Sequence, residues 1–354
     1  MSAASPVPPS VGPVSQQDPT APGRKEDHIE LAFQSQVASG QLDPRFDYEP
    51  LLAAHPAPGS LPPTPWGERS LRAPLWVSSM TGGTEKAFVI NQNLARAAGE
   101  FGIGMGLGSC RSLLYDDHRF KDFNVRPIAG ADAALYANLG VAQVQTLLDD
   151  GEAYRIVQMV QALSLDGLII HVNPLQEWLQ PEGDRFTVAP LVTITALLEA
   201  LPELPVIVKE VGQGMGPASL RALLRLPLLA IDTAANGGTN FSKLELFRSD
   251  ALARQAYGGL TQVGHSATEM VRQINALVVE EGDRVACRQL IISGGVQGFL
   301  DGYYLTQLSE LPAVYGQASA FLRYAREDYG TLRAYVTAQL RGLELASTYL
   351  RPRF

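Results

Sequence analysis

Short apolar runs separated by helix-length segments recur along most of this chain. Eight runs have the character of buried strands: 74–80, 102–108, 134–139, 167–172, 205–211, 228–234, 289–293 and 313–318. Between several of them, apolar residues recur at i, i+3 or i+4, and i+7, which is the stripe of a helix lying on a sheet. Three such stripes are Ile90, Leu94, Ala97 and Phe101; Ile156, Val157, Val160 and Leu163; and Met270, Val271, Ile274, Leu277 and Val278.

Eight strands that alternate with helices predict an α/β protein with a (β/α)8 TIM barrel, with a doubly wound open sheet as the alternative. The eighth helix is expected in the segment after Tyr324. Residues 1–23 are rich in Pro, Ser, Ala and Gln and have no periodicity, so we expect a disordered tail there. The rest, 24–354, is expected to be a single barrel domain.

Composition limits the classes of function that remain open. The chain has 354 residues, of which 46% are hydrophobic and 18% charged. No apolar run approaches the roughly 20 residues of a membrane span, and the N-terminus lacks the order of a signal peptide, so a cytoplasmic protein is expected. A net charge of −8 argues against nucleic acid but allows an anionic small ligand in a locally basic pocket. Cys110 and Cys287 are too few for a disulfide framework or a zinc site, so they are expected to pack in the core.

Polar residues and glycines follow the apolar runs. The segment HVNPLQEW places His171, Asn173, Gln176 and Glu177 at the end of the fourth run. Because the carboxyl ends of parallel strands meet on one face of a barrel, these groups and the glycine-rich segments after the other runs should converge there. A glycine pair in a single loop is typical of a simple turn, but the repetition on one face favours a binding rim. The turns after the seventh and eighth runs offer backbone N–H groups to a phosphate, as FMN requires.

Seven motifs occur in a fixed order: RKEDHIELA, MTGGTEKA, NLG, HVNPLQE, VKEVG, GGTNFSKLE and SGG. In this order they resemble the type 2 isopentenyl diphosphate isomerases, from residue 24 to about residue 324. The resemblance implies an enzyme that uses reduced FMN and Mg2+, without net redox change, to interconvert isopentenyl and dimethylallyl diphosphates in isoprenoid biosynthesis. It further implies NADPH as the reductant and a homo-oligomer, a tetramer or larger.

The resemblance also implies a role for individual positions around the flavin. The implied flavin-binding residues are Met80, Thr81, Gly82, Ser109, Asn138, Lys209, Ala234, Thr239, Gly295, Val296, Gln297, Gly316, Gln317 and Ala318. Lys209 would face the N1 and C2 carbonyl region, where an ammonium group stabilises reduced, anionic flavin. Thr239 and the backbone amides of the last two loops would hold the flavin phosphate.

The implied substrate-binding residues are Arg24, Lys25, Ser109, Cys110, Arg111, His171, Asn173 and Gln176. Glu177 would be the Mg2+ ligand, a hard carboxylate suited to a cation that also binds phosphate oxygens. Gln176 would lie across the prenyl group from the flavin and would relay or align a proton, with flavin N5 as donor and acceptor. The implied catalytic residues are thus Gln176, Glu177, His171 and Lys209.

Three positions depart from the family pattern. Gln297 stands where many members have Arg, Phe241 where others have Trp, and Ala234 where a hydroxyl residue often contacts the flavin.

Two other functions stay open. An FMN-dependent 2-hydroxy acid oxidase needs a catalytic His with a nearby Arg, and the candidate His265 has no arginine close in sequence. A non-catalytic flavin-binding protein would leave the HxNxxQE and RKxxHI motifs without a role.

Overall fold

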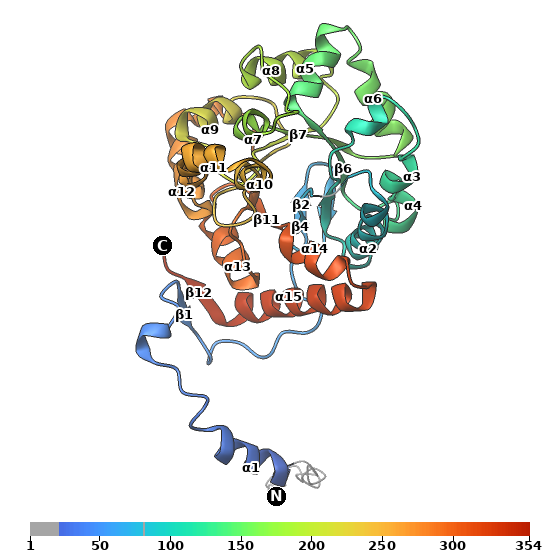
Figure 1. Cartoon of the computed structure of the whole chain (residues 1–354). Coiled ribbons are helices and arrows are strands. Elements are labelled where there is room, and N and C mark those ends of the chain that lie inside the picture. Colours follow the sequence, from blue (N-terminus) through green and yellow to red (C-terminus); the bar gives the residue numbers. More distant parts are fainter. Residues whose placement is uncertain (1–20, 81) are drawn as a thin grey trace, which may run out of the picture. The chain divides into compact units, whose positions relative to one another are not determined.

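A computed structural model describes residues 21–80 and 82–354. The chain divides into two compact units, the first ending at Pro44 and the second comprising Arg45–Phe354. The described part of the first unit contains helix α1 (Ala21–Leu31) and a short 3-10 helix η1 (Ser39–Gln41), drawn in blue in Figure 1. Helix α1 begins ahead of the expected start at residue 24. Residues 1–20 of the predicted tail lie outside the described residues, so its disorder stays a prediction.

Eight parallel strands of the second unit close into a barrel in the order β10-β11-β4-β5-β6-β7-β8-β9. They are Leu75–Val77 (β4), Gly104–Gly106 (β5), Leu135–Gly140 (β6), Gly167–His171 (β7), Val206–Lys209 (β8), Ala230–Asp232 (β9), Leu290–Ser293 (β10) and Ala313–Gln317 (β11). Each corresponds to one of the eight apolar runs. The predicted TIM barrel is therefore confirmed, although most strands are shorter than the runs because the polar ends leave the sheet.

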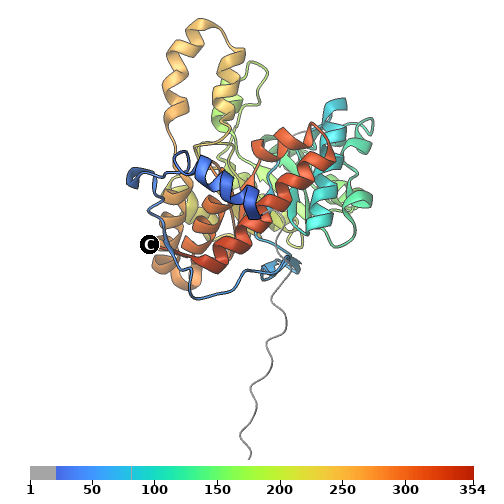
Figure 2. The same ribbon diagram turned by 90° about the horizontal axis from the view of Figure 1, so that it is seen from below.

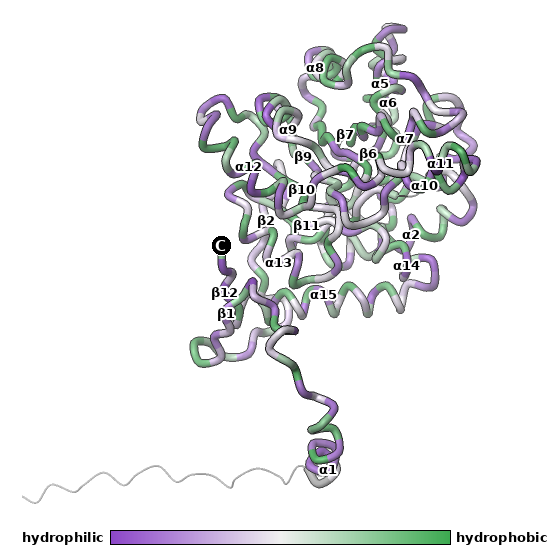
Figure 3. The backbone as a smooth tube through the Cα atoms, turned by 60° about the vertical axis from the view of Figure 1, so that its left-hand side comes forward, coloured by the Kyte–Doolittle hydropathy of each residue, from purple (hydrophilic) through white to green (hydrophobic). Residues whose placement is uncertain are grey.

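Helices surround the strands (Figure 1). The longer ones are Glu85–Phe101 (α2), Val141–Asp149 (α5), Tyr154–Ala162 (α6), Pro190–Ala200 (α8), Pro217–Leu224 (α9), Ala267–Glu281 (α12), Phe299–Leu308 (α13) and Tyr329–Tyr349 (α15). Helices α2 and α12 contain two of the predicted stripes, and α6 contains the third except for Leu163, which is its C-cap residue. Helix α15 is the helix expected after Tyr324. Hydrophobic and hydrophilic positions alternate along α15, as in a helix that packs on one side (Figure 3).

Shorter helices lie in the connections. They are Arg111–Leu114 (η2), Phe120–Phe123 (α3), Arg126–Ala129 (α4), Pro174–Leu179 (α7), Phe241–Arg248 (α10), Ala251–Tyr257 (α11), Gly258–Gln262 (η3), Gly282–Arg284 (η4) and Ser319–Ala325 (α14). Helices α10 and α11 follow β9 and project from the barrel, as the yellow pair in Figure 2 shows. The insertion after β9 therefore stands beside the face where the strands end.

The core has two layers because successive strand residues point to opposite faces. In β8, Val206 and Val208 pack against the surrounding helices, whereas Ile207 points into the barrel. The interior layer also includes Trp76, Ile169, Ile291 and Val314 from other strands. The barrel is therefore filled with side chains, and a ligand has room only at its rim.

A hairpin of β2 (Thr64–Trp66) and β3 (Arg69–Leu71) closes the amino-terminal end of the barrel. The Trp66 ring centroid lies 4.9 Å from that of Trp76, and Trp76 lies 5.6 Å from Tyr136. Trp66 Nε1 donates a hydrogen bond of 3.1 Å to the Tyr136 hydroxyl. Burial of these aromatic groups stabilises the end of the barrel opposite the predicted site.

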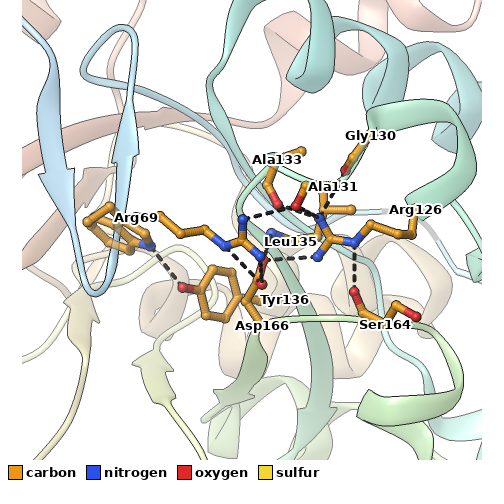
Figure 4. Close-up of polar contacts among 10 residues, drawn as sticks. Arg69, Arg126, Gly130, Ala131, Ala133, Leu135, Tyr136, Ser164 and Asp166 are labelled. Carbon is orange, nitrogen blue, oxygen red and sulfur yellow. Dashed lines mark hydrogen bonds and ion pairs between the residues drawn. The ribbon is translucent and has the colours of Figure 1, made fainter.

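Asp166 ties the hairpin to the barrel (Figure 4). Its carboxylate forms ion pairs with Arg69 and Arg126, and it accepts a hydrogen bond of 2.8 Å from the Leu135 backbone N–H. Two guanidinium groups on one partly buried carboxylate make a network that is worth more than an isolated surface pair. These contacts stabilise the amino-terminal end of the barrel by holding the β2–β3 hairpin against it.

The chain termini of the second unit also meet. Strand β1 (Phe46–Tyr48) pairs antiparallel with β12 (Leu350–Pro352) and fixes the end of α15.

Cys110 and Cys287 are free and buried, so their predicted packing role is confirmed. Among the described residues, no helix is both long and apolar enough to cross a membrane.

Candidate active site

A cavity of about 400 Å³ lies where the barrel strands end. The predicted flavin-binding residues that line it are Met80, Lys209, Ala234, Thr239, Gly295, Val296, Gln297, Gly316, Gln317 and Ala318. They come from the ends of five different strands and the loops that follow, which only the closed barrel brings together. Most of the predicted flavin-binding set therefore surrounds one cavity.

The lining of this cavity is positively charged. Lys209 and Arg323 are its basic side chains, and none of the described lining residues is acidic. The whole chain carries a net charge of −8, so the cavity differs in sign from the protein around it. Such a local surplus of positive charge favours an anionic ligand.

Two glycines allow the ends of β10 and β11 to pack closely against the segments that follow β9 and β4. Gly294 has a φ of +89°, and a Cβ there would lie 2.0 Å from the Ala235 carbonyl oxygen. A Cβ at Gly316 would lie 2.5 Å from Ser78 Oγ. Gln317 Nε2 donates to the Val296 carbonyl at 3.2 Å and so joins the two loops. Gly294 therefore admits no Cβ, whereas a Cβ at Gly316 would require the Ser78 side chain to move. At both positions the backbone forms part of the cavity wall.

Several polar groups at the cavity have no protein partner. Within the described chain, the hydroxyls of Ser78 and Ser79 are buried and make no hydrogen bond. Since buried polar groups are normally satisfied, unpaired hydroxyls in a cavity wall indicate a ligand or water that bonds to them. Ser78 and Ser79 directly precede the MTGGTEKA motif in the sequence, but the predicted flavin-binding residues of this segment begin at Met80.

Lys209 is held next to a buried carboxylate. It lies beside Asp232 on the neighbouring strand, and its ammonium group donates to the Glu210 carbonyl at 2.6 Å. Burial lowers the pKa of Lys209, and the charge of Asp232 opposes that shift. Burial likewise raises the pKa of Asp232, and Lys209 opposes it. Each charge thus stabilises the other where neither is well solvated.

Asp232 also shapes the wall at Ala234. The Asp232 carboxylate accepts hydrogen bonds from the Ser293 hydroxyl and, at 3.2 Å, from the Ala234 N–H. Ala234 has a φ of +37°, which is unusual for a residue with a Cβ. Its N–H is therefore used within the protein, and its carbonyl oxygen accepts a hydrogen bond of 3.1 Å from the Gly214 N–H. The predicted contact of Ala234 with the flavin stays a prediction.

A second group of predicted residues surrounds the end of β7. His171 Nδ1 lies 2.8 Å from Asn138 Oδ1, and Asn138 Nδ2 donates to the Leu107 carbonyl at 3.1 Å. Because Asn138 presents its oxygen, His171 must carry a proton on Nδ1, and its Nε2 is unprotonated when the ring is neutral. Burial, and then the charge of Lys209, lowers the pKa of His171 to about 3, so the ring is neutral at physiological pH.

Helix α7 fixes the other three side chains of the HVNPLQE motif. Asn173 Nδ2 donates to Gln176 Oε1 at 3.1 Å and to Glu177 Oε1 at 2.9 Å. Gln176 Nε2 lies 3.4 Å from Glu245 Oε1 on α10. The spacings of three and four residues place these groups on one turn of the helix, so the carboxamide and the carboxylate have defined orientations.

Asp184 links the motif to the predicted diphosphate loop. Its carboxylate pairs with Arg111 at 3.0 Å and accepts from Gln143 Nε2 at 2.7 Å. Its backbone N–H donates to Glu177 Oε2 at 2.7 Å. Neither Asp184 nor Glu245 was assigned a role from the sequence, although Glu245 is the last residue of the GGTNFSKLE motif. Its closeness to Gln176 arises only when the chain folds.

The other predicted residues lie outside the cavity lining. A Cβ at Gly82 would lie 2.6 Å from the Ser109 carbonyl, so these two predicted sites are in contact. The Cys110 thiol is fully buried, points to the Gly108 carbonyl, and has its pKa raised to about 12 by burial. Its predicted substrate contact stays a prediction. Thr81 lies outside the described residues.

Arg24 and Lys25 belong to the first unit. Both are exposed on α1. They remain predicted substrate-binding residues.

His265, the candidate for an oxidase, lies near Gly216 and is not among the residues that line the cavity.

The TIM-barrel fold of the chain occurs in solved structures. The chain is similar to a mandelate oxidase variant with an FMN monooxide adduct, with a TM-score of 0.51, 15% identity and 82% and 83% of the two chains covered. It is also similar to a flavocytochrome b2 variant with bound sulfite, with a TM-score of 0.58, 12% identity and 85% and 70% covered. At these identities, the similarity establishes the TIM-barrel fold alone.

Curated sequences define the family. The chain is 34% identical to an isopentenyl-diphosphate delta-isomerase of Synechocystis sp., covering 93% of this chain and 91% of the relative. It is 34% identical to that of Rickettsia felis, covering 91% and 90%, and 35% identical to that of Synechococcus sp., covering 92% and 90%. No protein-family model matches the chain. The chain belongs to the isopentenyl-diphosphate delta-isomerase family and is an isomerase, as its motifs predicted.

Proposed function

We propose that this protein converts isopentenyl diphosphate to dimethylallyl diphosphate with FMN and Mg2+ as cofactors, as a step of isoprenoid biosynthesis. The names of the curated relatives support the reaction. The observation in the structure that supports it best is the position of Lys209, which lines the cationic cavity and lies beside His171 on the neighbouring strand. A flavin cavity and a substrate site would thus share one wall.

The cavity residues fit FMN. A volume of about 400 Å³ lies within the range of cofactor sites. The unpaired Ser78 and Ser79 hydroxyls supply hydrogen-bonding groups, and the glycine loops after β10 and β11 bring backbone amides to the rim. Reduced FMN, when bound, would supply a proton donor and acceptor at N5.

Lys209 would face the N1 and C2 carbonyl region of the flavin. Its ammonium group is buried and held by the Glu210 carbonyl, so it does not need to reorganise when negative charge develops beside it. Asp232 supports the charged form of Lys209. The lysine would therefore stabilise the anionic form of the reduced cofactor.

Glu177 would hold Mg2+ together with oxygens of the substrate diphosphate. Among the described residues, no group of three or more His, Cys, Asp or Glu side chains could hold a metal. A single carboxylate still fits Mg2+, which keeps several waters and is commonly bound by one or two carboxylates plus phosphate oxygens. Asn173 and the Asp184 N–H orient the two oxygens of Glu177.

His171, Gln176 and Arg111 would orient the substrate. In the neutral ring, Nε2 of His171 is an acceptor. His171 would therefore bind a phosphate oxygen through Nε2 only as the imidazolium ion, a form that the negative charge of a nearby diphosphate favours. Gln176 has its carboxamide fixed by Asn173 and Glu245, which suits alignment or relay of a proton better than acid catalysis. The exposed Arg111 would exchange Asp184 for the diphosphate.

Three further features rest on the family resemblance. NADPH would reduce the flavin, the chain would form a homo-oligomer of four or more copies, and Arg24 and Lys25 would close over the diphosphate. Both residues are exposed on α1.

Product analysis under controlled redox conditions tests the function. The purified protein is mixed with FMN, reduced anaerobically with dithionite, and incubated with isopentenyl diphosphate and Mg2+. We expect dimethylallyl diphosphate in the NMR spectrum, and none with oxidised FMN or with EDTA. Oxygen consumption with lactate or mandelate, together with no isomerisation, would instead establish an oxidase.

A further inference from the structure

We propose that Arg323 supplies the positive charge that binds the phosphate monoester of FMN. This rests on the proposed FMN cofactor and extends it to a residue on the helix after the last barrel strand. Arg323 lies on α14 and lines the cavity together with Gly295, Val296 and Ala318. Helix α14 packs against α2 and α15, which fixes its position at the rim (Figure 1).

The other cation of the cavity is committed elsewhere. Lys209 lies on β8, which is separated from β11 by β9 and β10. Its ammonium group donates to the Glu210 carbonyl and lies beside the Asp232 carboxylate. At the end formed by the loops after β10 and β11, Arg323 is therefore the one cationic side chain among the described lining residues.

Arg323 is available for an anion. Within the part of the chain that the structure describes, its guanidinium forms no ion pair or hydrogen bond, and it lies 5.7 Å from the Tyr324 ring centroid. Most other arginines of the barrel have carboxylate partners, as Arg69, Arg126 and Arg248 do. A guanidinium that lines a cavity without a carboxylate can bind two phosphate oxygens at once.

Gln297 does not supply the missing charge. Its carboxamide is neutral, and its backbone N–H already donates to Asp301 Oδ2 at 2.9 Å. Asp301 in turn pairs with Arg45. A dianionic phosphate held at this rim would otherwise contact only neutral amides, so a nearby guanidinium would contribute the main charge-assisted contact.

The test compares FMN with riboflavin, which has the same ring system and no phosphate. Dissociation constants are measured from quenching of flavin fluorescence for the wild-type protein and for Arg323→Gln. We expect Arg323→Gln to bind FMN about tenfold more weakly and to bind riboflavin as the wild type does. Unchanged riboflavin binding also shows that the variant is folded. Salt should weaken FMN binding less in the variant than in the wild type.

Two further variants sharpen the result. Arg326→Gln removes an exposed charge at the end of the same helix that does not line the cavity, and it should leave both affinities unchanged. Adding Gln297→Arg to Arg323→Gln should restore FMN affinity, because it returns a cation to the same rim.

The outcomes separate this inference from the proposed function. If the wild-type protein binds FMN no more tightly than riboflavin, the FMN assignment fails and the role of Arg323 fails with it. If the wild type prefers FMN and Arg323→Gln keeps that preference, the inference alone is wrong. An unchanged FMN affinity with a raised KM for isopentenyl diphosphate would assign Arg323 to the substrate instead and overturn it.

Discussion

The two sides of the candidate site are built in different ways. The side after β9, β10 and β11 is made of glycine loops, such as those at Gly294 and Gly316, and it surrounds an open cavity. The side after β6 and β7 is made of side chains that bond to one another, from Asn138 and His171 to Glu177. Lys209 lies between them.

This difference affects how each side tolerates substitution. A backbone amide remains when a side chain changes, so the glycine side can accept a departure such as Gln297 if a cation elsewhere provides charge. On the other side, each polar group has a specific partner, and removing one leaves the next unsatisfied. We therefore expect side-chain substitutions near β7 to affect turnover strongly and those near β10 to affect mainly cofactor affinity.

The largest effect is expected for Glu177→Gln. The change removes the anionic Mg2+ ligand, and kcat should fall by at least about a hundredfold while FMN stays bound. Steady-state kinetics with Mg2+ titration, with flavin absorbance on the same sample, measures both. Because a Gln cannot accept both hydrogen bonds from Asn173 and the Asp184 N–H, thermal melting must be checked. If the folded variant loses its flavin, the side after β6 and β7 also holds the cofactor, and the division into a cofactor side and a substrate side is wrong.

Alanine at both Arg24 and Lys25 should have the next largest effect. If these cations close over the diphosphate, KM should rise and kcat should fall together, with roughly a tenfold to hundredfold loss in kcat/KM. The matched control is deletion of residues 1–20, which should leave kinetics unchanged. Wild-type kinetics in the double variant would show that Arg24 and Lys25 do not bind the substrate and that the residues of the barrel are sufficient.

Lys209→Ala tests the residue shared by both sides. Reduced flavin carries a negative charge that oxidised flavin lacks, so the variant should lose affinity for reduced FMN roughly tenfold more than for oxidised FMN. Anaerobic titrations of both forms give the two dissociation constants, and the shift in flavin potential gives the same ratio independently. Equal loss of both forms would mean that Lys209 acts only through packing.

The smallest effect concerns the pH dependence of stability. Folding lowers the pKa of His171 to about 3 from about 6.5 in the unfolded chain. Between these values the unfolded state binds a proton that the folded state does not, so stability falls as pH falls through this range and is retained above it. Urea unfolding at pH 5 and pH 7 should show a smaller pH slope for His171→Gln, by at most about 1.4 kcal/mol per pH unit. If the wild type and His171→Gln have the same pH slope, the pKa of His171 does not change on folding, and the prediction is wrong.

The sequence determined the barrel and the order of its functional motifs. Apolar runs and helical stripes are local patterns, so the eight strands and helices such as α2 and α12 could be predicted from them. The HVNPLQE motif could likewise be placed on one strand end because its residues are close along the chain. Strand ends were less accurate, since polar residues leave the sheet where the site begins.

Only the tertiary structure decided which distant groups meet. Asp232 faces Lys209 because β8 and β9 are neighbours, Asp184 reaches Arg111 across 73 positions, and Arg323 shares a cavity with Lys209 because the barrel closes. None of these pairs has a spacing that a local pattern could reveal. Charges and hydrogen bonds act over a few ångströms in space, whereas sequence periodicity records only the burial of each element's own face.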